Sequence, residues 1–277
     1  MTEHRTAHRR RATPTTWLLR AIVVGYLLLL VAWPLSLVAR NALDGGFGNV
    51  QALLEDPDVV HALRLTVVVA LWAVMLNTVF GVGISILLVR YRFPGKRVLS
   101  ALLDLPLSVS PVVVGLAIVL VYGGRGGWLG PTLEANGLQV VYATPGMVLA
   151  TAFVALPLVI REVVPVLEEV GMEQELAAQS LGASAWQRFR RITLPSIRWA
   201  VVYGVVLSLA RSLGEFGAVK IVSGNVLGET RTATLVVEEK YLNFDKAGAY
   251  ATAFLLALVS VACITVVSLV RPKEGTR

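Results

Sequence analysis

Residues 176–195 read LAAQSLGASAWQRFRRITLP, a stretch rich in small residues and arginine that lies between two long apolar segments. Small and apolar residues fall on related turns of a helix at Ala177, Ala178, Leu181 and Ala185, and Gly182 interrupts that helix. The second half of the stretch carries a short apolar stripe at helical spacing, with arginines on the other faces. Pro195 is expected to end the unit, because the residue before a proline is driven out of the α region. The stretch therefore predicts a helix, a break, a second helix and a stop.

Two interpretations of this stretch are open on physical grounds. Its small-residue surface would let a groove of another protein approach the backbone closely. Alternatively, the stretch is an amphipathic loop that lies on the inner leaflet, as basic helices with aromatic residues often do. The residues of the stretch do not decide between these two roles.

Outside this stretch the chain is dominated by apolar runs. It has 277 residues, of which 56% are hydrophobic and 16% charged, whereas a soluble domain is about one-quarter charged. Runs of about 20 apolar residues are long enough to cross the hydrocarbon core of a bilayer. We therefore predict an all-α, polytopic membrane bundle of six transmembrane helices. The predicted spans are 17–38, 61–89, 99–121, 145–164, 197–222 and 247–270.

The distribution of arginine and lysine predicts the orientation of the bundle. Most of these residues fall in the N-terminal tail, in alternate loops and at the C-terminus, which places both termini in the cytoplasm by the positive-inside rule. The transmembrane domain is predicted at 17–270, with a cytoplasmic loop at 165–197. A disordered basic tail at 1–16 would lie near anionic lipid headgroups, and a second tail spans 271–277. This reading accounts for the net charge of +7 without any nucleic-acid partner.

The loop also resembles a known motif. Ala177-Ala178, Gly182 and the run from Ile192 to Pro195 are spaced as in the EAA loop of ATP-binding-cassette (ABC) importer permeases. The glutamate of that motif is replaced by Leu176, and Glu175 stands one place early. The resemblance implies a coupling helix that docks on a dimer of separate ATP-binding subunits. The implied coupling residues are Ala177, Ala178, Gly182, Ala183, Trp186, Phe189, Ile192, Leu194 and Pro195.

Further segments narrow the resemblance. DLPLSVSPVVVGL at 104–116, GEFGA at 214–218 and NFDKAGAY at 243–250 are similar to permeases of sulfate and thiosulfate importers, most closely the W-type subunit. This resemblance implies a type I importer permease of the bacterial inner membrane. Its partners would be a T-type second permease, membrane lipid and an extracytoplasmic sulfate-binding protein. Because molybdate permeases share GEFGA, a molybdate or tungstate importer is an alternative.

The chain itself contains no site for ATP. No G-x-x-x-x-G-K-[ST] run occurs in the sequence, so nothing would cradle the phosphates or supply the hydroxyl that binds Mg²⁺. ATP and Mg²⁺ are therefore expected on a partner ATPase, and this chain is expected to be a transport subunit without enzymatic activity, cofactor or metal. A secondary anion transporter that needs no ATPase is a second alternative. A membrane enzyme is disfavoured, because no cluster of catalytic residue types is evident.

Two groups of polar residues fall inside predicted spans. Arg211 and Glu215 are four residues apart, which would place them on one helix face as an ion pair. Arg211 would then border an anion path, since a guanidinium fork suits an oxyanion, or the pair would serve only to lock helices. Ser108 and Ser110 would expose hydroxyls to a cavity, or they would be helix-packing positions.

Overall fold

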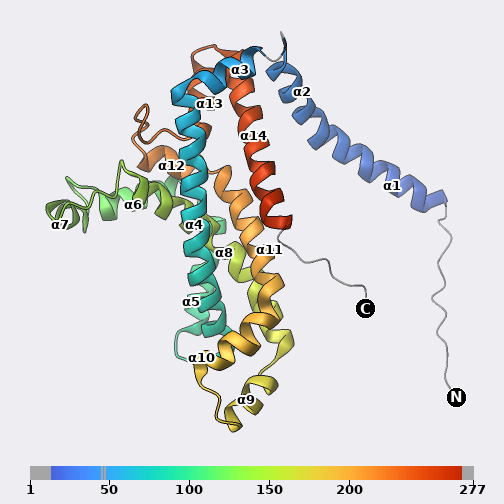
Figure 1. The fold of residues 1–277 in the computed structure, drawn as a ribbon, viewed down its shortest axis with the longest axis vertical. Coiled ribbons are helices and arrows are strands. Elements are labelled where there is room, and N and C mark those ends of the chain that lie inside the picture. The colour runs from blue at the N-terminus through green and yellow to red at the C-terminus, as the bar shows by residue number, and fades with distance from the viewer. Residues whose placement is uncertain (1–13, 45, 47, 270–277) are drawn as a thin grey trace.

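A computed structural model describes residues 14–44, 46 and 48–269, and every regular element within these residues is a helix (Figure 1). The all-α prediction is therefore confirmed for this part of the chain. The predicted tails at 1–16 and 271–277 lie outside the described residues, except that residues 14–16 begin the first helix. That helix starts three residues before the predicted span.

Three long helices form the centre of the molecule: α4 (Pro57–Arg90), α8 (Thr144–Val170) and α11 (Leu194–Leu213). They approach closely around Val159 of α8. A Cβ atom added to Gly81 of α4 would lie 2.9 Å from Val159 Cγ1, and one added to Gly204 of α11 would lie 2.9 Å from Val159 Cα. The positions that face Val159 from α4 and α11, Gly81 and Gly204, therefore have no room for a side chain. Small residues at such positions let membrane helices approach closely and gain packing contacts.

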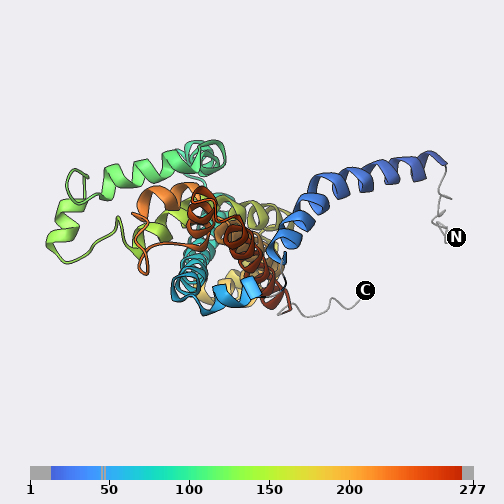
Figure 2. The same ribbon diagram turned by 90° about the horizontal axis from the view of Figure 1, so that it is seen from above.

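The other helices surround this centre or extend from it (Figures 1 and 2). A helix interrupted by one wide π-helical turn, α1–η1–α2, extends away from the bundle on one side, and α6 and α7 extend on another. At one end of the bundle lie α3 and α13, and at the opposite end lie α9 and α10 (Figure 1). The bounds are α1 (Pro14–Leu27), η1 (Leu28–Ala32), α2 (Trp33–Ala42), α3 (Gly48–Glu55), α5 (Lys96–Ser108), α6 (Pro111–Tyr122), α7 (Gly130–Ala135), α9 (Glu173–Ser180), α10 (Ala185–Arg188), η2 (Phe189–Thr193), α12 (Gly217–Val222), α13 (Ala233–Leu242) and α14 (Lys246–Leu269).

Five helices in the described part are long and apolar enough to cross a membrane, and a sixth crossing exists only as the bent pair α5–α6. The prediction of one continuous helix over 99–121 is therefore wrong. The two helices meet at 115°, because Pro111 begins α6 and holds Ser110 in an extended conformation (ψ 134°). Val109 is also extended, so the chain turns between the two helices.

The continuous helix predicted over 197–222 is also wrong. Helix α11 ends at Leu213, residues 214–216 are not helical, and α12 begins at Gly217. Residues 214–217 read Gly-Glu-Phe-Gly, and these two glycines are the signal in the sequence that could have indicated the break.

Pro195 does not stop a helix, contrary to the prediction. Residues 185–213 form one uninterrupted helical run, with Pro195 in the first turn of α11. A proline in a helix cannot donate to the carbonyl four residues earlier and clashes with it. Here the wide π-helical turn η2 comes directly before Pro195, and Leu194 N donates to the Phe189 carbonyl, five residues back. The changed hydrogen-bond register accommodates the proline.

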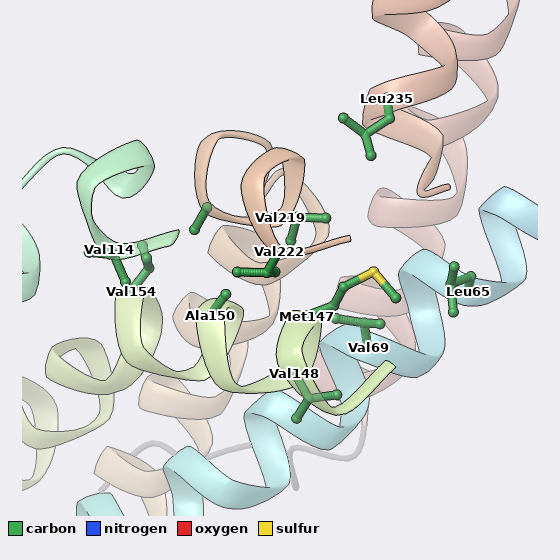
Figure 3. Close-up of a cluster of buried hydrophobic side chains, with 11 residues drawn as sticks. Leu65, Val69, Val114, Met147, Val148, Ala150, Val154, Val219, Val222 and Leu235 are labelled. Carbon is green, nitrogen blue, oxygen red and sulfur yellow. The ribbon is translucent and has the colours of Figure 1, made fainter. Parts of the chain in front are cut away.

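A buried apolar cluster joins the broken elements to the long helices (Figure 3). Met147 of α8 lies at its centre, with no exposed surface. Val69 of α4, Val114 of α6 and Val219 of α12 also belong to this cluster. The positions of α6 and α12 are therefore fixed by the same core that holds the bundle together.

Candidate functional site

The first candidate site is the 173–193 segment, which comprises α9, α10 and η2 at one end of the bundle (Figure 1). A sharp turn at Gly182 separates its helices. Gly182 has φ +84°, a conformation that glycine adopts at little cost. Its N–H donates to the Gln179 carbonyl at 2.9 Å, and Ala183 N–H donates to the Ala178 carbonyl at 3.0 Å. This is a Schellman ending of α9, and it confirms the predicted break at the glycine.

Side-chain hydrogen bonds stabilise this turn at the start of α10 and across it. Ser184 caps α10, since its hydroxyl accepts from Gln187 N and the Gln187 side chain accepts from Ser184 N. Across the turn, Arg188 Nη1 donates to Gln179 Oε1 at 2.5 Å. The segment is thus a defined helix–turn–helix unit.

The tip of this unit is apolar and exposed. Leu181 is 89% exposed and Trp186 is 65% exposed, and the Trp186 and Phe189 rings pack with centroids 5.5 Å apart. Nothing lies within 4 Å of the point where a Cβ of Gly182 would stand. The implied coupling residues divide by burial: Ala177, Gly182, Trp186, Leu194 and Pro195 are exposed, and Ala178, Ala183, Phe189 and Ile192 are half-buried.

The structure gives Glu175 two partners at this site, Arg90 and Thr193, which sequence reasoning did not connect to it. Arg90, at the last turn of α4, donates from Nη2 to Glu175 Oε1 at 3.1 Å and from Nη1 to the Leu167 carbonyl at 3.1 Å. Thr193 Oγ1 donates to the same Glu175 oxygen at 2.9 Å. The only signal in the sequence was the displaced glutamate, and its partner Arg90 stands 85 residues earlier.

The second candidate site is the place where the two helix breaks meet. A Cβ on Gly217, at the start of α12, would lie 3.2 Å from Pro111 Cβ, so the break before α12 abuts the break before α6. Ser108 and Ser110 lie at the break between α5 and α6, and both are exposed.

Arg211 and Glu215 form the predicted ion pair, with Arg211 Nη1 2.7 Å from Glu215 Oε2. The prediction that the two residues lie on one helix face is wrong, because α11 ends at Leu213, before Glu215. Glu215 is held by the break instead: its Oε1 accepts from Ala218 N at 3.0 Å, and its carbonyl accepts from Thr234 Oγ1 at 3.0 Å. The contact with Arg211 is ionic and does not have hydrogen-bond geometry. The Glu215 side chain is 2% exposed and that of Arg211 is 38% exposed, so one end of the pair is fixed and the other is accessible.

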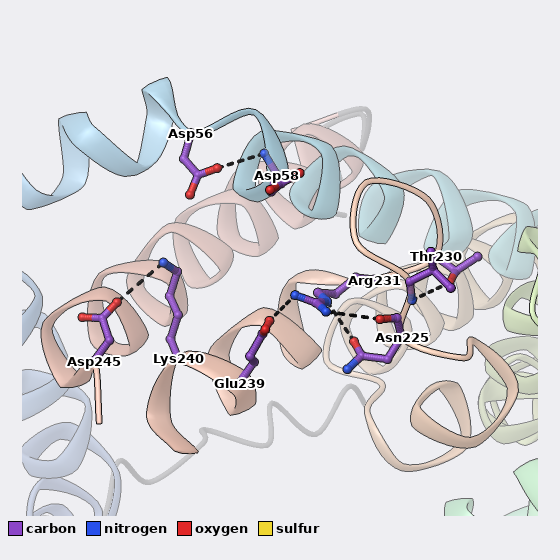
Figure 4. A network of polar contacts seen from close by, with 9 residues as sticks. Asp56, Asp58, Asn225, Thr230, Arg231, Glu239, Lys240 and Asp245 are labelled. Atoms are coloured by element: carbon purple, nitrogen blue, oxygen red, sulfur yellow. Dashed lines mark hydrogen bonds and ion pairs between the residues drawn. The ribbon is translucent and has the colours of Figure 1, made fainter. Parts of the chain in front are cut away.

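The end of the bundle opposite to the 173–193 segment carries a polar network (Figure 4). Arg231 donates from Nε to Asn225 Oδ1 at 3.0 Å and pairs with Glu239 of α13. Lys240 and Asp245 form a longer ion pair at 3.6 Å. The Arg231 contacts fix the loop before α13 against that helix, and the Lys240–Asp245 pair joins α13 to the turn that follows it. Among the described residues, no group of three or more His, Cys, Asp or Glu side chains is placed to hold a metal ion.

Comparison with known proteins places this architecture in context. The family model described as "Binding-protein-dependent transport system inner membrane component" matches residues 77–274. The chain is 46% identical over 259 residues to the "Sulfate transport system permease protein CysW" of Synechocystis sp., covering 94% of both chains. It is 35% identical over 268 residues to the "Sulfate transport system permease protein CysT" of Escherichia coli, covering 97% of this chain and 96% of that one.

Two solved structures share the fold. One is a bacterial ABC transporter involved in the import of the acidic polysaccharide alginate, with a TM-score of 0.76 and 18% identity over 92% of this chain and 95% of that chain. The other is a bacterial alginate ABC transporter in complex with a periplasmic protein bound to an alginate pentasaccharide. Its TM-score is 0.74 at 18% identity, over 91% of this chain and 93% of that one.

Proposed function

The chain belongs to the family of binding-protein-dependent transport system inner membrane components, and from this premise we propose how it works as a permease subunit of a sulfate ABC importer. The observation that carries the sulfate assignment is the identity of 46% to a CysW sulfate permease over nearly the whole length of both chains. The long apolar helices support a multi-pass protein of the inner membrane. Thiosulfate is a further substrate to test, because it is an oxyanion of similar charge.

The pathway is formed with a second permease. The chain is similar to both CysW and CysT proteins, which supports a W-type subunit that pairs with a T-type partner. The α1–η1–α2 helix has no buried residues in its most apolar stretch, so this chain leaves a large apolar surface for lipid or for that partner. A sulfate-binding protein delivers the anion, as the alginate transporter complex with its periplasmic protein suggests by analogy of fold.

Transport is driven through the 173–193 segment. We assign it as the coupling loop that docks on a separate ATPase dimer, where ATP and Mg²⁺ bind. Its defined turn, its apolar tip and the open space at Gly182 support this role. An exposed apolar tip costs free energy in water unless another surface covers it. The segment and both termini would then lie on the cytoplasmic side.

Arg211 is the proposed contact for the anion. Its accessible guanidinium offers a planar fork for a doubly charged oxyanion, and the buried Glu215 holds the side chain in place. Ser108 and Ser110 would add hydroxyl donors at the adjacent break. When the ATPase dimer closes, the two permeases would change the side of the membrane to which this site opens.

The experiment is reconstitution of the four components in proteoliposomes, with sulfate uptake measured against molybdate and thiosulfate uptake. We expect uptake of sulfate that requires ATP, the ATPase and the binding protein. Sulfate uptake that persists without the ATPase would support a secondary transporter. Uptake of molybdate in preference to sulfate would overturn the substrate assignment.

A further inference from the structure

Arg90 joins three separate parts of the chain at one point. It is the last residue of α4, and its guanidinium donates both to the carbonyl of Leu167 near the end of α8 and to the carboxylate of Glu175 in α9. Glu175 in turn accepts from Thr193, at the end of η2 and directly before α11. A single ion pair therefore connects the first helix of the 173–193 segment to all three central helices.

This contact is enclosed. The Arg90 side chain is 6% exposed and that of Glu175 is 14% exposed, and charge-assisted hydrogen bonds in such surroundings are stronger than those in water. Hydrogen bonds weaken steeply when their distance or angle changes, so a displacement of Glu175 strains its contacts with both Arg90 and Thr193.

The position of the glutamate explains its departure from the EAA pattern. Consecutive residues of a helix point about 100° apart. Leu176, at the position of the family glutamate, is exposed, whereas Glu175 faces inward to Arg90. In this chain the carboxylate near the alanine pair is thus committed to an internal contact, and an apolar side chain takes the outer position.

We propose that Arg90 and Glu175 are positioning residues that transmit movement of the coupling loop to the ends of α4, α8 and α11. This proposal rests on the proposed function, because it requires an ATPase that moves the 173–193 segment. With the contact intact, displacement of α9 pulls on Arg90 and Thr193 together. Without it, α9 can move on its docking surface while the central helices stay in place.

The test uses the four-component complex in proteoliposomes and measures three quantities: the amount of ATPase subunit that co-purifies, the rate of ATP hydrolysis, and sulfate imported per ATP hydrolysed. For Arg90→Gln we expect the ATPase to remain bound and hydrolysis to continue. Sulfate imported per ATP should fall about tenfold, within the range of coupling free energies between linked sites. Glu175→Gln keeps an acceptor for Thr193 and should give a smaller fall.

The double variant Arg90→Gln with Glu175→Gln separates transmission from folding. A single substitution leaves one buried charge without its partner, which can destabilise the fold, whereas the double variant leaves none. We expect the double variant to regain wild-type stability and to remain uncoupled. If its ratio of sulfate to ATP equals that of the wild type, the proposal is overturned.

A matched control is available nearby. Arg92 lies two residues after Arg90, outside the 173–193 segment, and is exposed. Arg92→Gln should leave the ratio unchanged, and an equal fall in this control would also overturn the proposal. A different result would contradict the proposed function itself, namely sulfate uptake by the wild-type complex that does not depend on the ATPase.

Discussion

At the scale of single residues, glycines serve two opposite purposes in this chain. Gly204 is required because a Cβ there would lie 2.9 Å from the backbone of Val159. Gly182 and Gly95 are required because their φ angles are +84° and +87°, while open space surrounds them. The first kind fixes the distance between helices, and the second kind fixes the direction of a turn.

Gly204→Ala should destabilise the bundle by about 1–3 kcal/mol, as overpacking of a close contact does. The matched control is Gly83→Ala in α4, where a Cβ would meet nothing within 4 Å and alanine favours the helix. The measurement is the midpoint of thermal unfolding in detergent. A midpoint that is lower for Gly83→Ala than for Gly204→Ala would contradict the packing around Val159.

The Arg211–Glu215 pair invites a test that separates transport from structure. Arg211→Gln leaves the buried Glu215 without its counter-charge and should reduce both assembly and uptake. Because Arg211 is 38% exposed, the loss of stability should stay below the value of about 3–5 kcal/mol that applies to a fully buried pair. The double variant Arg211→Gln with Glu215→Gln removes both charges. We expect it to restore assembly with the second permease while sulfate uptake stays low. Recovery of uptake together with assembly would show that the pair only holds the helices.

At the scale of elements, length and apolar composition predicted where helices occur but not where they break. The bend before Pro111 was accessible in principle, because a proline restricts the residue before it. The break after Leu213 had a weaker signal, the glycines 214 and 217, and its geometry depends on contacts of Glu215 with Ala218 and Thr234 that only the folded chain makes. The prediction that Pro195 ends a helix was also wrong. The π-helical turn η2 that accommodates this proline has no recognisable signal in the sequence.

Thiol labelling tests whether the break between α5 and α6 faces water. In a Cys263→Ala background, which removes the one cysteine of the chain, Ser110→Cys should react with a membrane-impermeant thiosulfonate reagent, and sulfate should slow the reaction. Val261→Cys, exposed in the middle of α14, is the control and should react slowly in lipid. Equal rates at the two positions would contradict an aqueous path at this break.

At the scale of the whole molecule, the sequence predicted a membrane bundle and a helix–turn–helix around Gly182, but not how the helices associate. The segment 17–38 was predicted as one span among six. The structure extends it away from the bundle with no buried residues in its apolar stretch (Figure 2). Whether this helix is buried depends on the surfaces of the other subunits, and the sequence of one chain does not contain that information. The contact between Arg90 and Glu175 was hidden for a different reason, because the two residues are 85 positions apart and only the folded chain brings them together.

Docking of the loop at Gly182 is tested most directly by comparing two tryptophan substitutions in the reconstituted importer. Gly182→Trp and Gly95→Trp impose a similar backbone strain of about 1–2 kcal/mol at a left-handed position, and neither Cβ meets another atom of this chain. Only the first lies on the proposed docking surface. We expect Gly182→Trp to abolish ATP-driven sulfate uptake and to weaken retention of the ATPase, with Gly95→Trp close to wild type. Normal uptake by Gly182→Trp would contradict the assignment of this segment as the site where the ATPase drives transport.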